Sequence, residues 1–156
     1  MTIRPYEPVR DAEALRVCLV EHQEFHRALE PSWPEGAAIV EDYVAYLERV
    51  CAKRDGQILI AERDHDVIGF ACVAPTLRSD SPDDPGPYAW LFEVYVKAPH
   101  RARGVGTALI GGAEAFARSR GAKEMRLAVL ERNEGARAVY RARGFRDYTR
   151  LLVKPL

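Results

Sequence analysis

The sequence predicts an α/β protein in which a mixed sheet carries helices on both faces. Three observations lead to this prediction. Two runs rich in branched and aromatic residues, 57–63 and 67–74, are separated by a few polar residues and predict a β-hairpin. Two amphipathic stretches of helical period come before the hairpin. After it, strand and helix patterns alternate. The resulting order, β-α-α-β-β-β-α-β-α-β, is typical of a layered sheet-and-helix domain.

Composition fits one globular domain over residues 1–156. Hydrophobic residues make up 47% and charged residues 29% of the chain, and we find no repeats or low-complexity tracts. The 23 basic and 23 acidic side chains balance, which argues against nucleic acid as a partner because nucleic-acid binding favours a basic excess. No apolar run is long enough for a membrane span, and the N-terminus lacks a signal-peptide core. We therefore expect neither nucleic acid nor membrane as partners.

The cysteines and other potential ligands indicate a reducing compartment and no metal. Cys18, Cys51 and Cys72 are odd in number and form no pair motif, so the chain is expected to be cytoplasmic, without a disulfide framework. Cys72 lies within a strand pattern and is expected in the core. No grouping of His, Cys, Asp and Glu has a convincing metal-ligand spacing, so no metal cofactor is expected.

The first half of the chain predicts a short strand and two helices before the hairpin. Thr2–Arg4 is the opening strand. Asp11 is expected to cap a helix that runs to about Gln23, and Glu35 begins a second helix that ends near Lys53. In the hairpin, His65 and Asp66 are expected to form the turn.

A glycine-rich turn after the fourth strand pattern is the most informative feature of the sequence. The strand covers 89–96, and a helical pattern covers 107–120; between them lies Arg101-Ala102-Arg103-Gly104-Val105-Gly106. The first amides of a helix lack partners and carry partial positive charge. Glycines allow anionic oxygens to approach the backbone, and the two arginines add full charges. The turn therefore predicts a phosphate or pyrophosphate site.

Two common phosphate motifs do not match this turn. A Walker A loop requires Gly-Lys followed by Ser or Thr, which is absent, and Leu109 occupies the place of the third glycine in a dinucleotide fingerprint. The spacing Arg-x-x-Gly-x-Gly after a hydrophobic strand instead resembles the acetyl-CoA loop of GNAT-type N-acetyltransferases.

A second motif downstream strengthens the resemblance. After a strand pattern at 125–130, the family typically shows Asn-x-x-Ala-x-x-x-Tyr-x-x-x-Gly-Phe, and this chain has the corresponding residues in register: Asn133, Ala136, Tyr140, Gly144 and Phe145. Gly144 suits the end of a short helix, and residues 147–153 predict a final strand. The detailed match covers about the C-terminal third of the chain.

The resemblance implies a GNAT-like, mostly antiparallel sheet with a splayed strand pair, and acetyl-CoA as co-substrate. It implies that pantetheine enters between the splayed strands, where the backbones of Val94, Tyr95 and Val96 hold it like an added strand. The residues expected to bind the rest of the cofactor are those of the loop and one helix-start asparagine: Arg101, Ala102, Arg103, Gly104, Val105, Gly106, Thr107 and Asn133.

The resemblance also assigns the catalytic groups. Tyr140 is expected to protonate the departing thiolate, and Glu93, on the strand before the loop, to accept the proton of the amine. A strand-face ion pair of Glu93 with a lysine or arginine is the alternative interpretation. Two other family positions for a base are Ala128 and Trp90 here, and these departures make a histone- or peptide-N-terminus enzyme a weaker interpretation. Glu131 is a fallback base, more typical of a surface loop.

We therefore expect an N-acetyltransferase that transfers the acetyl group directly to a primary amine of a small molecule. Protein or peptide acetylation, and a non-catalytic acyl-CoA-binding module, are the alternatives; a homodimer is possible. Aromatic side chains and a group of aspartates could surround the acceptor, although a polar helix face and a solvated loop are the more typical interpretations for most of them: His22, Phe25, His26, Trp33, Tyr43, Tyr46, Asp80, Asp83 and Asp84.

Overall fold

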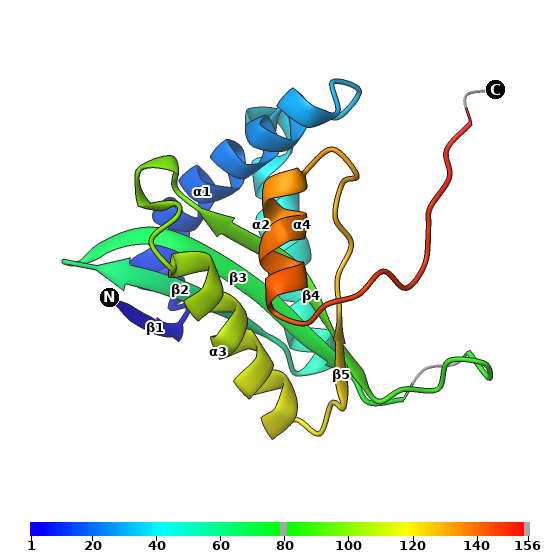
Figure 1. Ribbon diagram of the computed structural model, residues 1–156. Coiled ribbons are helices and arrows are strands. Elements are labelled where there is room, and N and C mark those ends of the chain that lie inside the picture. Colours follow the sequence, from blue (N-terminus) through cyan, green and yellow to red (C-terminus); the bar gives the residue numbers. More distant parts are fainter. Residues whose placement is uncertain (79–80, 155–156) are drawn as a thin grey trace.

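The computed structural model describes residues 1–78 and 81–154. In these ranges a five-stranded sheet has the order β1-β2-β3-β4-β5, antiparallel except for the last pair (Figure 1). The strands are β1 (Thr2–Pro5), β2 (Gln57–Arg63), β3 (Asp66–Thr76), β4 (Tyr88–Val96) and β5 (Glu124–Arg126). The helices are α1 (Pro8–Leu29), α2 (Gly36–Arg54), α3 (Val105–Ser119), α4 (Glu134–Ala142) and a 3-10 turn, η1 (Ala98–His100).

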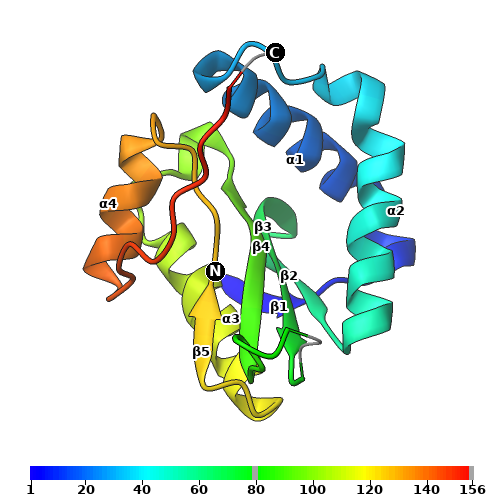
Figure 2. The ribbon, with the colours of Figure 1, turned by 90° about the vertical axis from the view of Figure 1, so that its right-hand side faces the viewer.

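Helices cover both faces of the sheet, as the sequence predicts. Figure 2 shows the strands between α1 and α2 on one side and α3 and α4 on the other. Leu15, Leu47 and Phe70 lie in the core beneath α1 and α2, and Leu109 and Ile110 lie in the core beneath α3. Burial of these apolar side chains on both faces holds the sheet between the two layers of helices.

The first helix is longer than the sequence pattern indicates. It begins at Pro8, whose missing N–H costs nothing in the first turn, and it continues six residues beyond Gln23 to Leu29. Asp11 is not the cap residue: it lies inside the first turn, where its Oδ2 accepts a hydrogen bond from the Glu7 amide at 2.8 Å. Both carboxylate oxygens of Asp11 also contact Arg4 at 2.7 Å, which ties β1 to α1.

The hairpin turn lies one residue earlier than expected. Arg63 pairs with Asp66, so Asp64 and His65 are the two turn residues. Both have positive φ, 53° and 69°, as a type I′ turn requires. Aspartate tolerates this conformation better than most residues because its short side chain can bond locally.

The expected separation of two neighbouring strands occurs between β4 and β5. These strands pair in parallel only from Tyr88 to Trp90 and from Glu124 to Arg126, and the strand pattern at 127–130 continues without pairing. A register shift between Cys72 and Val73 places an extra residue in β4 near Phe92. Such a bulge increases local twist, and it lies where β4 turns away from β5.

The expected final strand at 147–153 is wrong. Residues 145–154 contain no strand, and Figure 1 shows this segment leaving α4 and running away from the sheet. Because β5 ends at Arg126, the segment has no neighbouring strand to pair with, and Leu151 is 91% exposed. Among the described residues, no helix combines the length and apolar character needed to cross a bilayer.

Candidate active site

The glycine-rich turn joins β4 to α3 as the sequence predicts. Gly104 precedes the first residue of α3 and has φ 79°, a conformation that favours glycine, and Ala102 has φ 56°. The Gly104 carbonyl accepts the first hydrogen bond of the helix, from the Ala108 amide at 2.9 Å. The turn is therefore held by a left-handed backbone at the very start of the helix.

The amides of this turn have no acceptors within the part of the chain that the structure describes. None of the N–H groups from Ala102 to Thr107 makes a hydrogen bond there, and the first helix amides cannot bond within α3. A methyl group placed on Gly104 would meet no atom within 4 Å, so the space before the turn is open. These residues fit a diphosphate, because positively polarised donors converge on accessible space.

The two arginines of the turn differ in their surroundings. Arg101 Nε donates to the Val96 carbonyl at 2.9 Å, and its guanidinium lies 5.0 Å from the Phe25 ring and 5.6 Å from the Tyr95 ring. Arg103 is exposed and has no ion pair with any described residue. Arg101 therefore braces the turn against α1, whereas the Arg103 charge is available to an anion.

The splayed edge of β4 lies directly before this turn. Val94, Tyr95 and Val96 pair with β3 on one side, whereas β5 accompanies β4 only as far as Trp90 on the other. Since successive residues of a strand direct their amides and carbonyls to alternate sides, part of this stretch faces the gap without a strand partner.

Glu93 is the centre of a buried polar cluster on the α1 and α2 face of β4. The Tyr43 hydroxyl, from α2, donates a hydrogen bond to Glu93 Oε1. His22 Nδ1, from α1, lies 3.2 Å from Glu93 Oε2, and the Glu93 side chain is only 12% exposed. Cys72, also buried, pairs with Glu93 across β3 and β4.

Burial sets the protonation states in this cluster. Desolvation raises the pKa of Glu93 to about 7, and the Tyr43 hydrogen bond opposes that rise. Burial lowers the pKa of His22 to about 3, so this imidazole is neutral at pH 7. The neutral His22 ring therefore lies beside the carboxylate without adding a positive charge. The Glu93 carboxyl group therefore gains and loses its proton near neutral pH.

Tyr140 and Asn133 lie on α4 and at its start. Burial raises the pKa of Tyr140 to about 12, and the negative charge of Glu93 adds to the rise, so the phenol keeps its proton at pH 7. The Tyr140 ring packs on Phe145 with a centroid distance of 5.6 Å. Asn133 is the N-cap of α4, since its Oδ1 accepts from the Ala136 amide at 3.2 Å.

Tyr43 and His22 are the functional candidates whose roles the sequence does not reveal. Both are expected from the sequence only as part of an aromatic wall, because helical spacing does not show which strand residue a side chain will meet. Glu131, the fallback base, is exposed and forms an ion pair with Arg137 at 3.1 Å.

Two of the three aspartates expected around the acceptor are already bonded to other side chains. Asp84 Oδ1 contacts Arg126 at 2.8 Å, and Asp83 accepts a hydrogen bond from Ser81. Asp80 lies outside the described residues. Of the described side chains, no group of three from His, Cys, Asp and Glu is placed to hold a metal ion.

Comparison with known proteins identifies the family. The model of the acetyltransferase (GNAT) family matches residues 22–145. The uncharacterized N-acetyltransferase YhfO of Bacillus subtilis (strain 168) is 30% identical over 140 residues, 89% of this chain and 86% of that protein. Thialysine N-epsilon-acetyltransferase of Bos taurus is 37% identical over 60 residues, which cover 38% of this chain and 35% of the relative.

Solved structures share the whole fold. A tetramutant of the BH1408 protein from Bacillus halodurans superposes with a TM-score of 0.85 at 14% identity, covering 100% of both chains. Aminoglycoside N-acetyltransferase AAC(6')-Iy, solved in complex with CoA, superposes with a TM-score of 0.71 at 21% identity, covering 99% of this chain and 98% of the other. The arrangement of strands and helices is therefore shared with acetyltransferases, and the chain belongs to the GNAT family of N-acetyltransferases.

Proposed function

We propose that this protein uses acetyl-CoA to acetylate a primary amine of a small molecule by direct transfer within a ternary complex. The observation that carries the proposal is the position of Glu93, a half-buried carboxylate on β4 next to the site where β5 separates from that strand. The open amides of the turn at 102–107 lie at one end of the same strand. The proposed proton acceptor therefore lies on the strand that leads directly into the proposed cofactor site.

Amine acetylation needs a proton acceptor because only the neutral amine is nucleophilic. An alkyl amine with a pKa of about 10.4 is neutral in roughly one molecule in 2,500 at pH 7. Its deprotonation costs about 4.6 kcal/mol at that pH, from about 1.36 kcal/mol per pKa unit. A base with a pKa near neutrality offsets part of this cost, and burial gives Glu93 a pKa of about 7.

Each candidate residue has one role in this proposal. Acetyl-CoA supplies an activated acyl group, held by the loop amides, by the Arg103 charge and by the free edge of β4 at 94–96. Glu93 accepts the proton that the attacking amine loses as its C–N bond forms. Tyr140, which is protonated at neutral pH, gives its proton to the sulfur as the C–S bond breaks. Asn133 caps α4 and so fixes the helix that carries Tyr140.

The names of the relatives support a small-molecule acceptor. Thialysine N-epsilon-acetyltransferase and aminoglycoside N-acetyltransferase are both named for small-molecule amines. Their acceptors differ widely in charge and size, so they support the class of acceptor and not its identity.

Acetyl-CoA consumption measured against polyamines, aminoglycosides, amino acids and peptides tests the proposal. We expect free CoA to be released with at least one small amine, and mass spectrometry to find that amine heavier by one acetyl group. Transfer only to peptides would favour the protein acetyltransferase. Tight acetyl-CoA binding without transfer to any amine would favour the binding module and contradict the proposal.

A further inference from the structure

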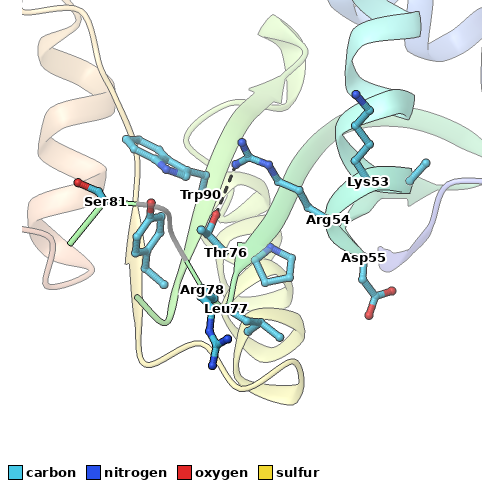
Figure 3. A pocket seen from close by; sticks show the side chains of 11 residues that line it. Lys53, Arg54, Asp55, Thr76, Leu77, Arg78, Ser81 and Trp90 are labelled. Atoms are coloured by element: carbon cyan, nitrogen blue, oxygen red, sulfur yellow. Dashed lines mark hydrogen bonds between the residues drawn. The ribbon is translucent and has the colours of Figure 1, made fainter. Parts of the chain in front are cut away.

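A cationic groove opens on the α2 side of the sheet, toward the N-terminal end of β4. It has a volume of about 700 Å³ and is formed by the end of α2, the end of β3 and the segment that follows, and the first residues of β4. Its basic residues are Lys53, Arg54 and Arg78, all exposed at its walls (Figure 3). Its volume lies within the range of small-molecule sites.

The Arg54 side chain extends across this groove and does not fold back onto the end of α2. Figure 3 shows its side chain extending from α2 toward Thr76 and Trp90. Its Nη1 donates to Thr76 Oγ1 at 3.4 Å, a long hydrogen bond, and its guanidinium lies 5.9 Å from the Phe92 ring. The carbonyl of Cys51 at the helix end is already bonded by the Gly56 amide at 2.8 Å. Most of the five guanidinium donors therefore remain open to a ligand.

The charge of the groove is positive because its cations lack carboxylate partners. Within residues 1–78 and 81–154, neither Lys53, Arg54 nor Arg78 forms an ion pair. Asp55, the carboxylate at the groove wall, is paired with Arg120 at 3.2 Å. The nearby Asp84 is held by Arg126 and cannot offset the three positive charges.

The groove and Glu93 are placed along the same strand, β4. Trp90 lines the groove, and Glu93 lies three residues further along the strand. Because of the bulge at Phe92 their β3 partners are only two residues apart, so the separation is about 7 Å at about 3.3 Å per residue. Aromatic rings lie beside the groove and beside Glu93: Phe92 is next to Arg54, and Tyr46 stacks on Tyr43 with a centroid distance of 5.7 Å. An acceptor with its amine at Glu93 thus has an apolar surface for its chain and cations for its far end.

We propose that the acceptor is an amine with an oxyanion, a carboxylate or a phosphate, at its far end, and that Arg54 binds this oxyanion. The inference rests on the proposed function, because it assumes that the amine reacts beside Glu93. A guanidinium with open donors matches an oxyanion in geometry and charge. The three cations of the groove repel a polycation, so an aminoglycoside is a poor acceptor here.

A series of six-carbon amines with matched chains tests this inference. A chain of six or seven bonds of about 1.5 Å spans most of the path from Glu93 to the groove. We expect kcat/KM to be highest for 6-aminohexanoate, at least tenfold lower for its uncharged analogue 6-aminohexanamide, and lowest for 1,6-diaminohexane. 5-Aminopentyl phosphate extends the comparison to the second oxyanion, and its preference over the amide supports the inference equally.

Arg54→Gln should remove the discrimination without removing the reaction. We expect it to raise the KM for 6-aminohexanoate about tenfold while the values for 6-aminohexanamide change less than twofold. Arg49→Gln is the matched control, because Arg49 lies on the same helix, 5.9 Å from the Tyr46 ring, but outside the groove. Circular dichroism of both variants checks that the fold is kept.

The outcomes separate this inference from the proposed function. If the amide or the diamine is acetylated as well as the carboxylate, or if Arg54→Gln slows all acceptors equally, the anionic acceptor is wrong and the acetylation of small amines stands. If no amine of any charge is acetylated, the proposed function fails and the inference fails with it.

Discussion

The two halves of β4 offer different kinds of chemical groups. The C-terminal half, Val94–Val96 with the turn that follows, offers main-chain groups: free amides, an unpaired strand edge and a glycine of φ 79°. The N-terminal half, up to Glu93, offers side chains supplied by other elements, with His22 from α1 and Tyr43 from α2. The proposed cofactor site, in the C-terminal or cofactor half of β4, is made of backbone encoded in one short segment. The proposed acceptor site, in the N-terminal or acceptor half, forms only after distant segments pack together.

Replacing Glu93 should have the largest effect, and it should lower the rate of acetyl transfer without changing cofactor binding. For Glu93→Gln we expect kcat/KM at pH 7.5 to fall about 10²- to 10⁴-fold, the usual contribution of a general base, with the Kd for acetyl-CoA unchanged. Initial rates and calorimetry measure the two quantities. Glu131→Gln removes an exposed carboxylate and should match the parent. A parent-like rate for Glu93→Gln would remove Glu93 from the mechanism.

Replacing the glycine of the turn should affect only the cofactor half. A branched side chain is strained at the φ of 79°, by about 1–3 kcal/mol, so Gly104→Val should weaken acetyl-CoA binding roughly 10- to 100-fold in calorimetry. Gly121→Val is the control: Gly121 has φ 87° and open space, but lies just beyond the other end of α3. It should lower the melting temperature and leave the Kd intact. Equal affinity loss in both variants would indicate a general effect of strain.

Removing the phenol of α4 should give a smaller loss of turnover. Tyr140→Phe keeps the ring that packs on Phe145 and removes the proton donor, so we expect kcat to fall about tenfold while the Kd for acetyl-CoA changes little. If Tyr140→Phe forms the acetylated product at the parent rate, Tyr140 is not the acid. Tyr148→Phe, at a ring 64% exposed, should have no effect on kcat.

The smallest predicted effect is a shift of the pH profile. In the parent, kcat/KM should rise with pH through about 7 as Glu93 ionises. The Tyr43 hydroxyl stabilises the ionised form, so Tyr43→Phe should raise the pKa of Glu93 and move the acid limb to higher pH. A rise of about one unit lowers the rate at pH 7 roughly fivefold.

The groups packed around Glu93 define the control for this profile. His22, Cys72 and Tyr140 also face the carboxylate, and none of them is charged at pH 7, so they do not titrate across the limb. Tyr6→Phe removes a hydroxyl bonded to a different carboxylate, Glu48, at 3.2 Å and should leave the limb in place. A limb that stays fixed in Tyr43→Phe would show that another group controls the profile.

The same contrast explains what the sequence could predict. The turn, the start of α3 and the N-cap at Asn133 follow from local rules: glycine at positive φ, unpaired first amides and a side chain that bonds three residues ahead. The resemblance to GNAT enzymes rests on the same local patterns. The local structure of the turn and of the start of α4 was therefore predictable at the level of single residues, whereas their binding of the cofactor stays a prediction.

The acceptor half was not predictable, because its contacts join residues far apart in the chain. Tyr43 and Glu93 are separated by 50 positions, and Arg54 meets Thr76 only because α2 ends beside β3. The expected strand at 147–153 failed for a related reason: its pattern suits a strand, but β5 ends too early to supply a partner. Periodicity describes what a segment prefers, and not which neighbour it will find.

The central claim is that main-chain amides next to Gly104 bind the diphosphate of coenzyme A, and amide NMR tests it most directly. Titration of ¹⁵N-labelled protein with CoA should shift the amides of residues 94–96 and 102–107 together and to saturation. Pantetheine, which lacks the diphosphate, should shift only the amides at 94–96. If CoA leaves the amides at 102–107 unmoved, or if pantetheine moves them equally, the diphosphate is not held there and the account is contradicted.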